Sequence, residues 1–271
     1  MALFSRRNGY VKSKLQYEGT DQALRNRIWN VFYEKEFSSD VNDWGLEFLK
    51  SYPITAKIAD KMGLPADISG SNLRDKVFSG DWYLIYDFVE SYLECVDKKT
   101  LKGLILQINS VLQEECSAYR IVDKIIAPIT NEAEIASIEQ GIDAPYPSVN
   151  THLRKALELY SDRQKSDYEN SVKESISAVE AMCCIITGKS GKQATLGSAI
   201  KKLSDSGVHI HGSMEKAFLA LYGYTSDENG IRHGGIDFTD VPAEDAKYML
   251  VSCSAFVNYL IEKWHKVGSV S

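Results

Sequence analysis

Residues 81–96, DWYLIYDFVESYLECV, form the clearest helical stretch in the N-terminal half of the chain. Their apolar side chains recur at spacings of three, four and seven residues, which places them on one face of an α-helix. The apolar positions are Trp82, Ile85, Tyr86, Val89, Tyr92, Leu93 and Val96. A face of this kind normally packs into a core, so we expect these residues to be structural.

The helical period continues on both sides of this stretch and predicts a mainly α fold. In the N-terminal half, helices are expected from Asp21, over 43–50, from Ile54 and from Leu101. In the C-terminal half, apolar stripes predict helices over 149–160, 196–203 and 214–222, and a last helix that starts near Pro242. A longer stripe predicts a helix over 168–186 that ends at Gly188.

One segment breaks the helical period. Residues 119–130, YRIVDKIIAPIT, read as a small β-hairpin that turns at Asp123 and Lys124. Asn131, with Glu134 three residues later, is a capping-box-like start to another helix. The stretch APYP at 144–147 is a stiff break. We therefore expect a helical domain with one hairpin over 1–145 and a helical bundle over 146–271.

Composition excludes several classes of protein. The formal net charge of -6 argues against a global basic field, so a nucleic-acid site must be a local patch. The odd cysteine count and the lack of metal-ligand spacing predict no disulfide framework and no metal site. We also expect no cofactor. Neither a secretory signal nor an apolar run that could cross a membrane is apparent, which predicts a cytoplasmic protein.

Residues 224–237, YTSDENGIRHGGID, form the one chemically dense loop. Its Arg232 guanidinium could hold two phosphate oxygens, and the His233 imidazole could move a proton near neutral pH. The loop leads to a helix N-terminus, which favours anions. On a structural interpretation, Arg232 simply pairs with Glu228 or with a buried carboxylate such as Glu180.

Other polar motifs are weaker. GKSGK at 188–192 lacks the spacing of a phosphate-binding loop and is read as a flexible loop. His209 and His211 lack a further metal ligand, so surface or capping roles are expected. Ser175 and Ser177 do not lie in a hydrolase motif.

Several segments together resemble a known combination of domains. DYENSVKESISAVEA (167–181), TLGSAIKKL (195–203) and LYGYTSDENGIRH (221–233) are similar to a HEPN domain of the sort found at the C-terminus of AbiJ-type abortive-infection proteins. FSRRNGY (4–10) and LRNRIWN (24–30) resemble the helical domain that precedes HEPN in such proteins. The resemblance covers most of the chain.

The resemblance implies a helical bundle that dimerises and, in active members, a metal-independent ribonuclease site shared across the dimer. That site consists of an Arg, a polar residue, three to five further residues and a His. Arg232 matches the Arg and His233 takes the polar position, whereas Asp237, Phe238 and Thr239 stand where the final His is expected. The same resemblance makes Glu180 a candidate to orient Arg232 through an ion pair.

These observations leave two interpretations open. In the first, the chain is a HEPN-type RNA-binding protein, or a metal-independent endoribonuclease, acting in phage defence or stress as a homodimer through its C-terminal bundle. Arg232 and His233 are then catalytic, and Glu180, Asn229 and Asp237 support them. In the second, the bundle is a non-catalytic module that binds a protein partner or a nucleotide.

Overall fold

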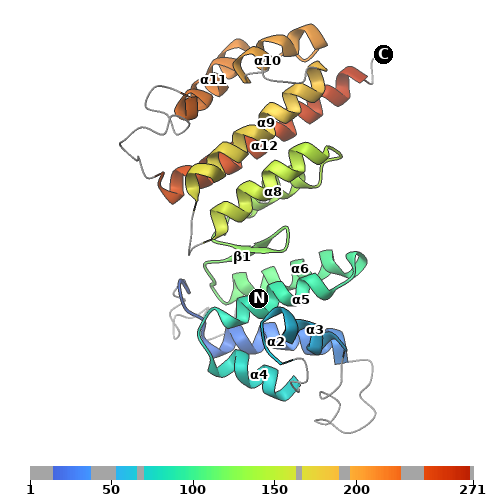
Figure 1. Cartoon of the computed structure of the whole chain (residues 1–271), viewed down its shortest axis with the longest axis vertical. Helices are drawn as coiled ribbons and strands as arrows, with labels where there is room; N and C mark the ends of the chain where they lie inside the picture. Colours follow the sequence, from blue (N-terminus) through green and yellow to red (C-terminus); the bar gives the residue numbers. More distant parts are fainter. Residues whose placement is uncertain are drawn as a thin grey trace. The chain divides into compact units, whose positions relative to one another are not determined.

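The computed structural model describes residues 15–37, 53–65, 70–162, 167–188, 196–226 and 241–268. These residues form helices and one antiparallel hairpin, so the predicted mainly α fold is confirmed (Figure 1). The chain divides into two compact units, Met1–Thr130 (the first unit) and Asn131–Ser271 (the second unit). None of the described helices is both long and apolar enough to cross a membrane.

The first unit is built from helices that precede a hairpin. The predicted helices from Asp21, Ile54, Asp81 and Leu101 are confirmed, and the short helix expected over 43–50 lies outside the described residues. The sequence pattern did not reveal α4, because this helix buries little more than Leu73 and Val77. The elements are α2 (Gln22–Phe37), α3 (Pro53–Lys61), α4 (Gly70–Ser79), α5 (Leu84–Cys95), α6 (Lys98–Glu114), β1 (Arg120–Val122) and β2 (Ile125–Ala127).

Aromatic rings fill the centre of the first unit. The Phe32 ring meets the rings of Phe88 and Tyr92 edge-on, with centroids 5.1 and 5.0 Å away. Trp29 lies against the same rings, 5.2 Å from Phe32 and 5.3 Å from Phe88. All four side chains are buried. Because edge-to-face pairs add to the free energy of burial, these rings fix how α2 packs against α5.

A buried arginine secures the end of α4. Arg25, on α2, is 6% exposed, and its Nη1 donates to the carbonyl oxygens of Val77, Phe78 and Gly80 at 2.8, 2.9 and 3.0 Å. Its Nε donates to the Thr20 hydroxyl at 3.0 Å. The last carbonyls of a helix have no partner within the helix and carry partial negative charge. Arg25 therefore satisfies acceptors that would otherwise be buried without a donor.

The predicted hairpin is present, with shorter strands than the segment suggested. β1 pairs antiparallel with β2, so that Arg120 lies opposite Ala127. The two turn residues, Asp123 and Lys124, have φ values of 44° and 75°. Positive φ at both central residues is the conformation of a type I′ turn, whose twist matches that of the strands.

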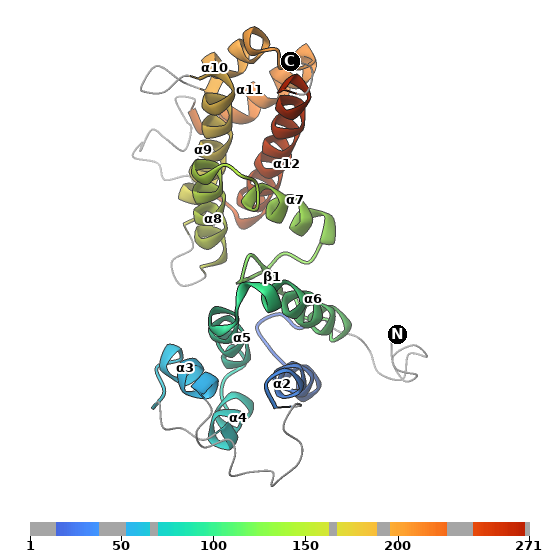
Figure 2. The same ribbon diagram turned by 90° about the vertical axis from the view of Figure 1, so that its right-hand side faces the viewer.

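The second unit is a bundle of helices, in which α8 and α12 both pack on α9. Figures 1 and 2 show α9 and α12 side by side and running in the same direction. The helices are α7 (Glu132–Ile142), α8 (Pro147–Ser161), α9 (Tyr168–Thr187), α10 (Leu196–Leu203), α11 (Gly212–Ser226) and α12 (Ala243–Gly268), with a 3₁₀ turn at Ser204–Ser206. The helical patterns predicted in this half are thus confirmed.

Predicted start and stop signals act as expected in this unit. The Asn131 side chain accepts hydrogen bonds from the backbone N–H groups of Ala133 and Glu134 at 2.9 and 3.3 Å, and so caps α7. Gly188 ends α9 in the left-handed conformation, with φ 64°.

The cysteines divide by burial. Cys183 and Cys253 are buried, and burial raises the pKa of each thiol to about 12. Cys184 is half-buried, so one member of the adjacent pair faces the core. Cys95 and Cys116 are also half-buried and free.

Candidate functional site

The Arg–His loop predicted to carry the chemistry falls in residues 227–240, which lie outside the described residues. Arg232, His233, Asn229 and Asp237 all belong to this segment, so their proximity to one another stays a prediction. Among the predicted site residues, Glu180 is the one that lies within the described ranges.

Glu180 lies half-buried on α9. Burial is the largest cause of the raised pKa of Cys183 and of Cys184, and the negative charge of Glu180 raises both further. This carboxylate therefore contributes negative potential to the C-terminal half of α9. Its expected pairing with Arg232 remains a prediction.

The helices on either side of the predicted loop are described. α11 precedes it, and α12 follows it after the buried Val241. Pro242 takes the cap position, because its carbonyl oxygen accepts the Ala246 N–H at 3.1 Å. Glu244 and Asp245 occupy the first turn of α12. These carboxylates stabilise the positive end of the helix but also oppose a bound phosphate there.

The two alternating histidines have the surface and capping roles expected of them. Both are exposed, and His211 Nδ1 accepts the backbone N–H of Ser213 at 3.2 Å near the start of α11. The His209 ring lies 3.3 Å from the Ser204 hydroxyl. Within the described ranges, no group of three or more His, Cys, Asp or Glu residues could hold a metal ion.

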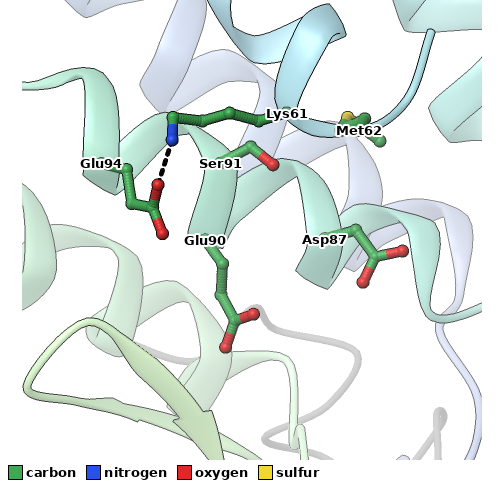
Figure 3. A pocket seen from close by; sticks show the side chains of 6 residues that line it. All are labelled: Lys61, Met62, Asp87, Glu90, Ser91 and Glu94. Carbon is green, nitrogen blue, oxygen red and sulfur yellow. Dashed lines mark hydrogen bonds and ion pairs between the residues drawn. The ribbon is translucent and has the colours of Figure 1, made fainter.

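A pocket in the first unit was not predicted from the sequence. It lies between α3 and α5, has a volume of about 380 Å³ and is shown in Figure 3. We call it the α5 pocket, and it is lined by Lys61, Met62, Asp87, Glu90, Ser91 and Glu94. The available signal was the spacing of its α5 residues, which at i, i+3, i+4 and i+7 share one helix face.

The α5 pocket is acidic, and its carboxylates differ in surroundings. Glu94 forms an ion pair with Lys61 at one end. Glu90 accepts the Ile126 N–H at 2.6 Å, which ties α5 to the hairpin. Burial raises the pKa of Glu90, and burial also raises that of Asp87. Asp87 is exposed, so water still reaches its charge, whereas the half-buried Glu90 has the Ile126 N–H as a partner that offsets part of its lost solvation.

Together, these features define a class of two-unit helical protein whose first unit ends in a small hairpin. Comparison with known families gives the assignment: residues 2–144 match AbiJ N-terminal domain 4. Because the match covers more than half of the 271 residues, the chain belongs to this AbiJ-type family. The relationship supports a role in abortive infection, a defence function. No curated protein and no solved structure matches the chain.

The family match and the packing differ over one helix. The match extends to residue 144 and includes α7, as does the predicted N-terminal domain of residues 1–145. The compact units instead meet between Thr130 and Asn131, because α7 packs with α8 and α12. The family match therefore assigns α7 to the N-terminal domain, whereas its packing assigns α7 to the second unit.

Proposed function

We propose that the second unit is a HEPN-type RNA-binding bundle that cleaves RNA without a metal, as the effector of an abortive-infection protein. The main support is that the HEPN-like segments follow an AbiJ N-terminal domain in the same chain. The segments 167–181 and 195–203 also coincide with α9 and α10, in keeping with the helical bundle that the resemblance implies.

In this proposal, the chemistry belongs to Arg232 and His233. The Arg232 guanidinium binds the scissile phosphate through two oxygens and stabilises the charge that develops there. The His233 imidazole takes the proton from the ribose 2′-hydroxyl or returns one to the leaving oxygen. Glu180, Asn229 and Asp237 hold these two side chains in place.

A single imidazole cannot serve as base and acid at once, so the proposal includes a homodimer through the second unit. Two-fold symmetry brings a second Arg232 and a second His233 to the same phosphate. Light scattering should give twice the mass of the chain. A strictly monomeric protein would exclude the shared site.

The competing function is a non-catalytic module that binds a protein or a nucleotide. It is favoured by Asp237, Phe238 and Thr239, which replace the final His of the active-site pattern. The net charge of -6 and the acidic first turn of α12 also disfavour RNA.

RNA cleavage in the presence of a chelator separates the two functions. We expect the purified full chain to cut mixed RNA in EDTA, and His233→Ala to lower the rate by about 100-fold or more. The exposed His209 provides the matched control, and His209→Ala should cut at the wild-type rate. Circular dichroism should show that both variants are folded. If the wild-type protein leaves RNA intact at high concentration, the non-catalytic module is correct.

A further inference from the structure

The α5 pocket has no part in the proposed function, and its charge needs an explanation. Three carboxylates from α5 line it, while Lys61 is its single positive side chain among the described lining residues. Asp87, Glu90 and Glu94 lie on the same helix face, where like charges at this spacing destabilise a helix. An arrangement that opposes folding in this way is consistent with a cation that binds there.

A hydroxyl group in the same pocket gives a second, independent indication of a ligand. Ser91 is only 9% exposed, yet its side chain makes no hydrogen bond to any group in the described part of the chain. Serine within a helix commonly bonds to the carbonyl four residues earlier, as Ser175 does to Ser171 at 2.8 Å. Figure 3 shows the Ser91 oxygen between the Lys61–Glu94 pair and Asp87. Ser91 therefore offers an unused hydrogen-bonding group to the pocket.

Size and ligand geometry indicate an extended organic cation rather than a metal ion. The volume of about 380 Å³ lies in the range of small-molecule sites and is far larger than one water or ion. The described carboxylates do not gather closely enough to hold a metal. Met62 adds an apolar side chain to the lining, which suits an alkyl chain.

The pocket already shows which cation its acidic face accepts. Lys61 places a primary ammonium on Glu94 at one end. At the other end, Asp87 and Ser91 are four residues apart on α5 and so lie one turn from each other, with no charged partner described for either. In Figure 3 the Asp87 carboxylate points away from Ser91, but Asp87 is exposed and its side chain can turn. A second ammonium there could then donate to the Asp87 carboxylate and to the Ser91 hydroxyl, because each ammonium has three donors.

We propose that the α5 pocket binds a primary alkylammonium group, of the kind carried by aliphatic polyamines, through Asp87 and Ser91. The inference concerns the first unit and does not rest on the proposed nuclease function. It gives the AbiJ-type domain a ligand site of its own.

Calorimetric titration of the full chain tests this site. Spermidine and putrescine should bind saturably at one site per chain, and added salt should weaken binding. Asp87→Asn should raise the Kd about fivefold, and Ser91→Ala about tenfold. Asp75, an exposed carboxylate on α4 in the same unit, provides the matched control. Asp75→Asn changes the net charge equally and should leave the Kd unchanged.

A stability measurement distinguishes the proposed role of Ser91 from a structural one. Because the hydroxyl has no partner among the described groups, Ser91→Ala should leave the thermal midpoint of the free protein unchanged. Spermidine should raise that midpoint in the wild type and clearly less in the variant. A large fall for the free variant would mean that the hydroxyl supports the fold, which would contradict the proposal.

Two results would overturn the site itself. One is the absence of saturable binding by either amine, and the other is an equal loss of affinity in Asp75→Asn and Asp87→Asn. N-acetyl-lysine methylamide, a lysine with both backbone ends blocked and a charged side-chain ammonium, distinguishes the two possible sources of the ammonium. Stronger binding of spermidine identifies a free polyamine, whereas stronger binding of the analogue identifies a lysine side chain of a partner, and either supports the site.

Discussion

The two units fill their interiors with different kinds of side chain. In the first unit, large rings such as those of Phe32 and Phe88 lie between the helices. There the buried Arg25 donates hydrogen bonds to the backbone carbonyls at the end of α4. In the second unit, small residues let helices approach closely. Gly141 on α7 faces Leu153 on α8, and the Ser171 hydroxyl on α9 donates to the Ala156 carbonyl on α8 at 2.8 Å.

This difference predicts that different kinds of substitution destabilise the two units. A core spaced by rings tolerates changes in volume when neighbours can shift, but it depends on the polar group that satisfies its buried backbone. A core of closely packed helices has its backbone satisfied internally, but it has no room for added atoms. The following substitutions test the contrast, starting with the largest expected effect.

Removal of the Arg25 side chain should cause the largest loss of stability. Arg25→Ala leaves buried carbonyls of Val77 and Phe78 without their donor, so we expect the free energy of unfolding to fall by about 3–5 kcal/mol. Denaturant titration followed by tryptophan fluorescence measures this, because Trp29 lies in the same unit. Arg25→Lys keeps the charge but not the planar guanidinium, and it should lose about half as much stability. No loss in Arg25→Lys would show that the several donors of the guanidinium are unimportant.

Added volume should damage the second unit. A Cβ atom on Gly141 would lie 2.7 Å from Leu153 Cδ1 and 3.5 Å from Asn258 Oδ1. Gly141→Ala should therefore destabilise the protein by about 1–3 kcal/mol, measured by denaturant titration.

Gly103 is the matched control for this substitution. It lies on α6 with no atom within 4 Å of an added Cβ. Gly103→Ala should stabilise by about 0.5–1 kcal/mol, because alanine loses less conformational entropy in a helix. The same sign for both variants would contradict the close-packing argument.

Loss of a hydroxyl between helices should have a smaller effect. Ser171→Ala removes a buried bond from α9 to α8 and leaves the Ala156 carbonyl with one partner fewer, so a loss of about 1 kcal/mol is expected. Ser177→Ala removes a local bond to the Lys173 carbonyl on the same, half-buried helix surface and should change stability by less than about 0.5 kcal/mol. Thermal unfolding of the two variants side by side compares them; equal losses would mean that the link between helices adds nothing.

The smallest expected effect is on how stability depends on pH, which should have opposite sign in the two units. At Glu174, burial raises the pKa, but hydrogen bonds from Lys155 and His152 outweigh it and hold the pKa below 4.5. Its stabilisation is thus present above pH 4.5 and is lost as pH falls through the lower, folded value. At Glu90, burial holds the pKa above 4.5, so the folded state binds the proton more tightly. Its contribution falls as pH rises from 4.5 through the raised value.

Hydrogen exchange followed by mass spectrometry reads the two units separately. Glu174→Gln should remove the loss of protection in the second unit below pH 4.5. Glu90→Gln should remove the loss in the first unit above pH 4.5, and it keeps an acceptor for the Ile126 N–H. If either substitution leaves its own unit's profile unchanged, that carboxylate does not control the pH dependence.

Local sequence patterns predicted most of the described fold because the signals are short-range. Apolar spacing located α5 and α6, and Asn131 and Gly188 marked helix ends through their own backbone chemistry. α4 was missed because two buried apolar residues make too weak a period. The α5 pocket was missed for another reason. Its carboxylates lie on the side of α5 that resembles an ordinary solvated surface, and only the packing of α3 turns that surface into a hollow.

The buried cysteines have a practical consequence, because their reaction with thiol reagents reports the opening of the second unit. Alkylating reagents react with the thiolate, and burial both shields Cys183 and Cys253 and raises the pKa of each thiol to about 12. Labelling of these two sites in the folded protein must therefore wait for the α9–α12 core to separate. The half-buried Cys116 of the first unit can react without such an event. When the bundle recloses faster than the thiol reacts, the ratio of labelling rates at Cys183 and Cys116 would thus report the fraction of molecules in which the bundle is open, without any engineered probe.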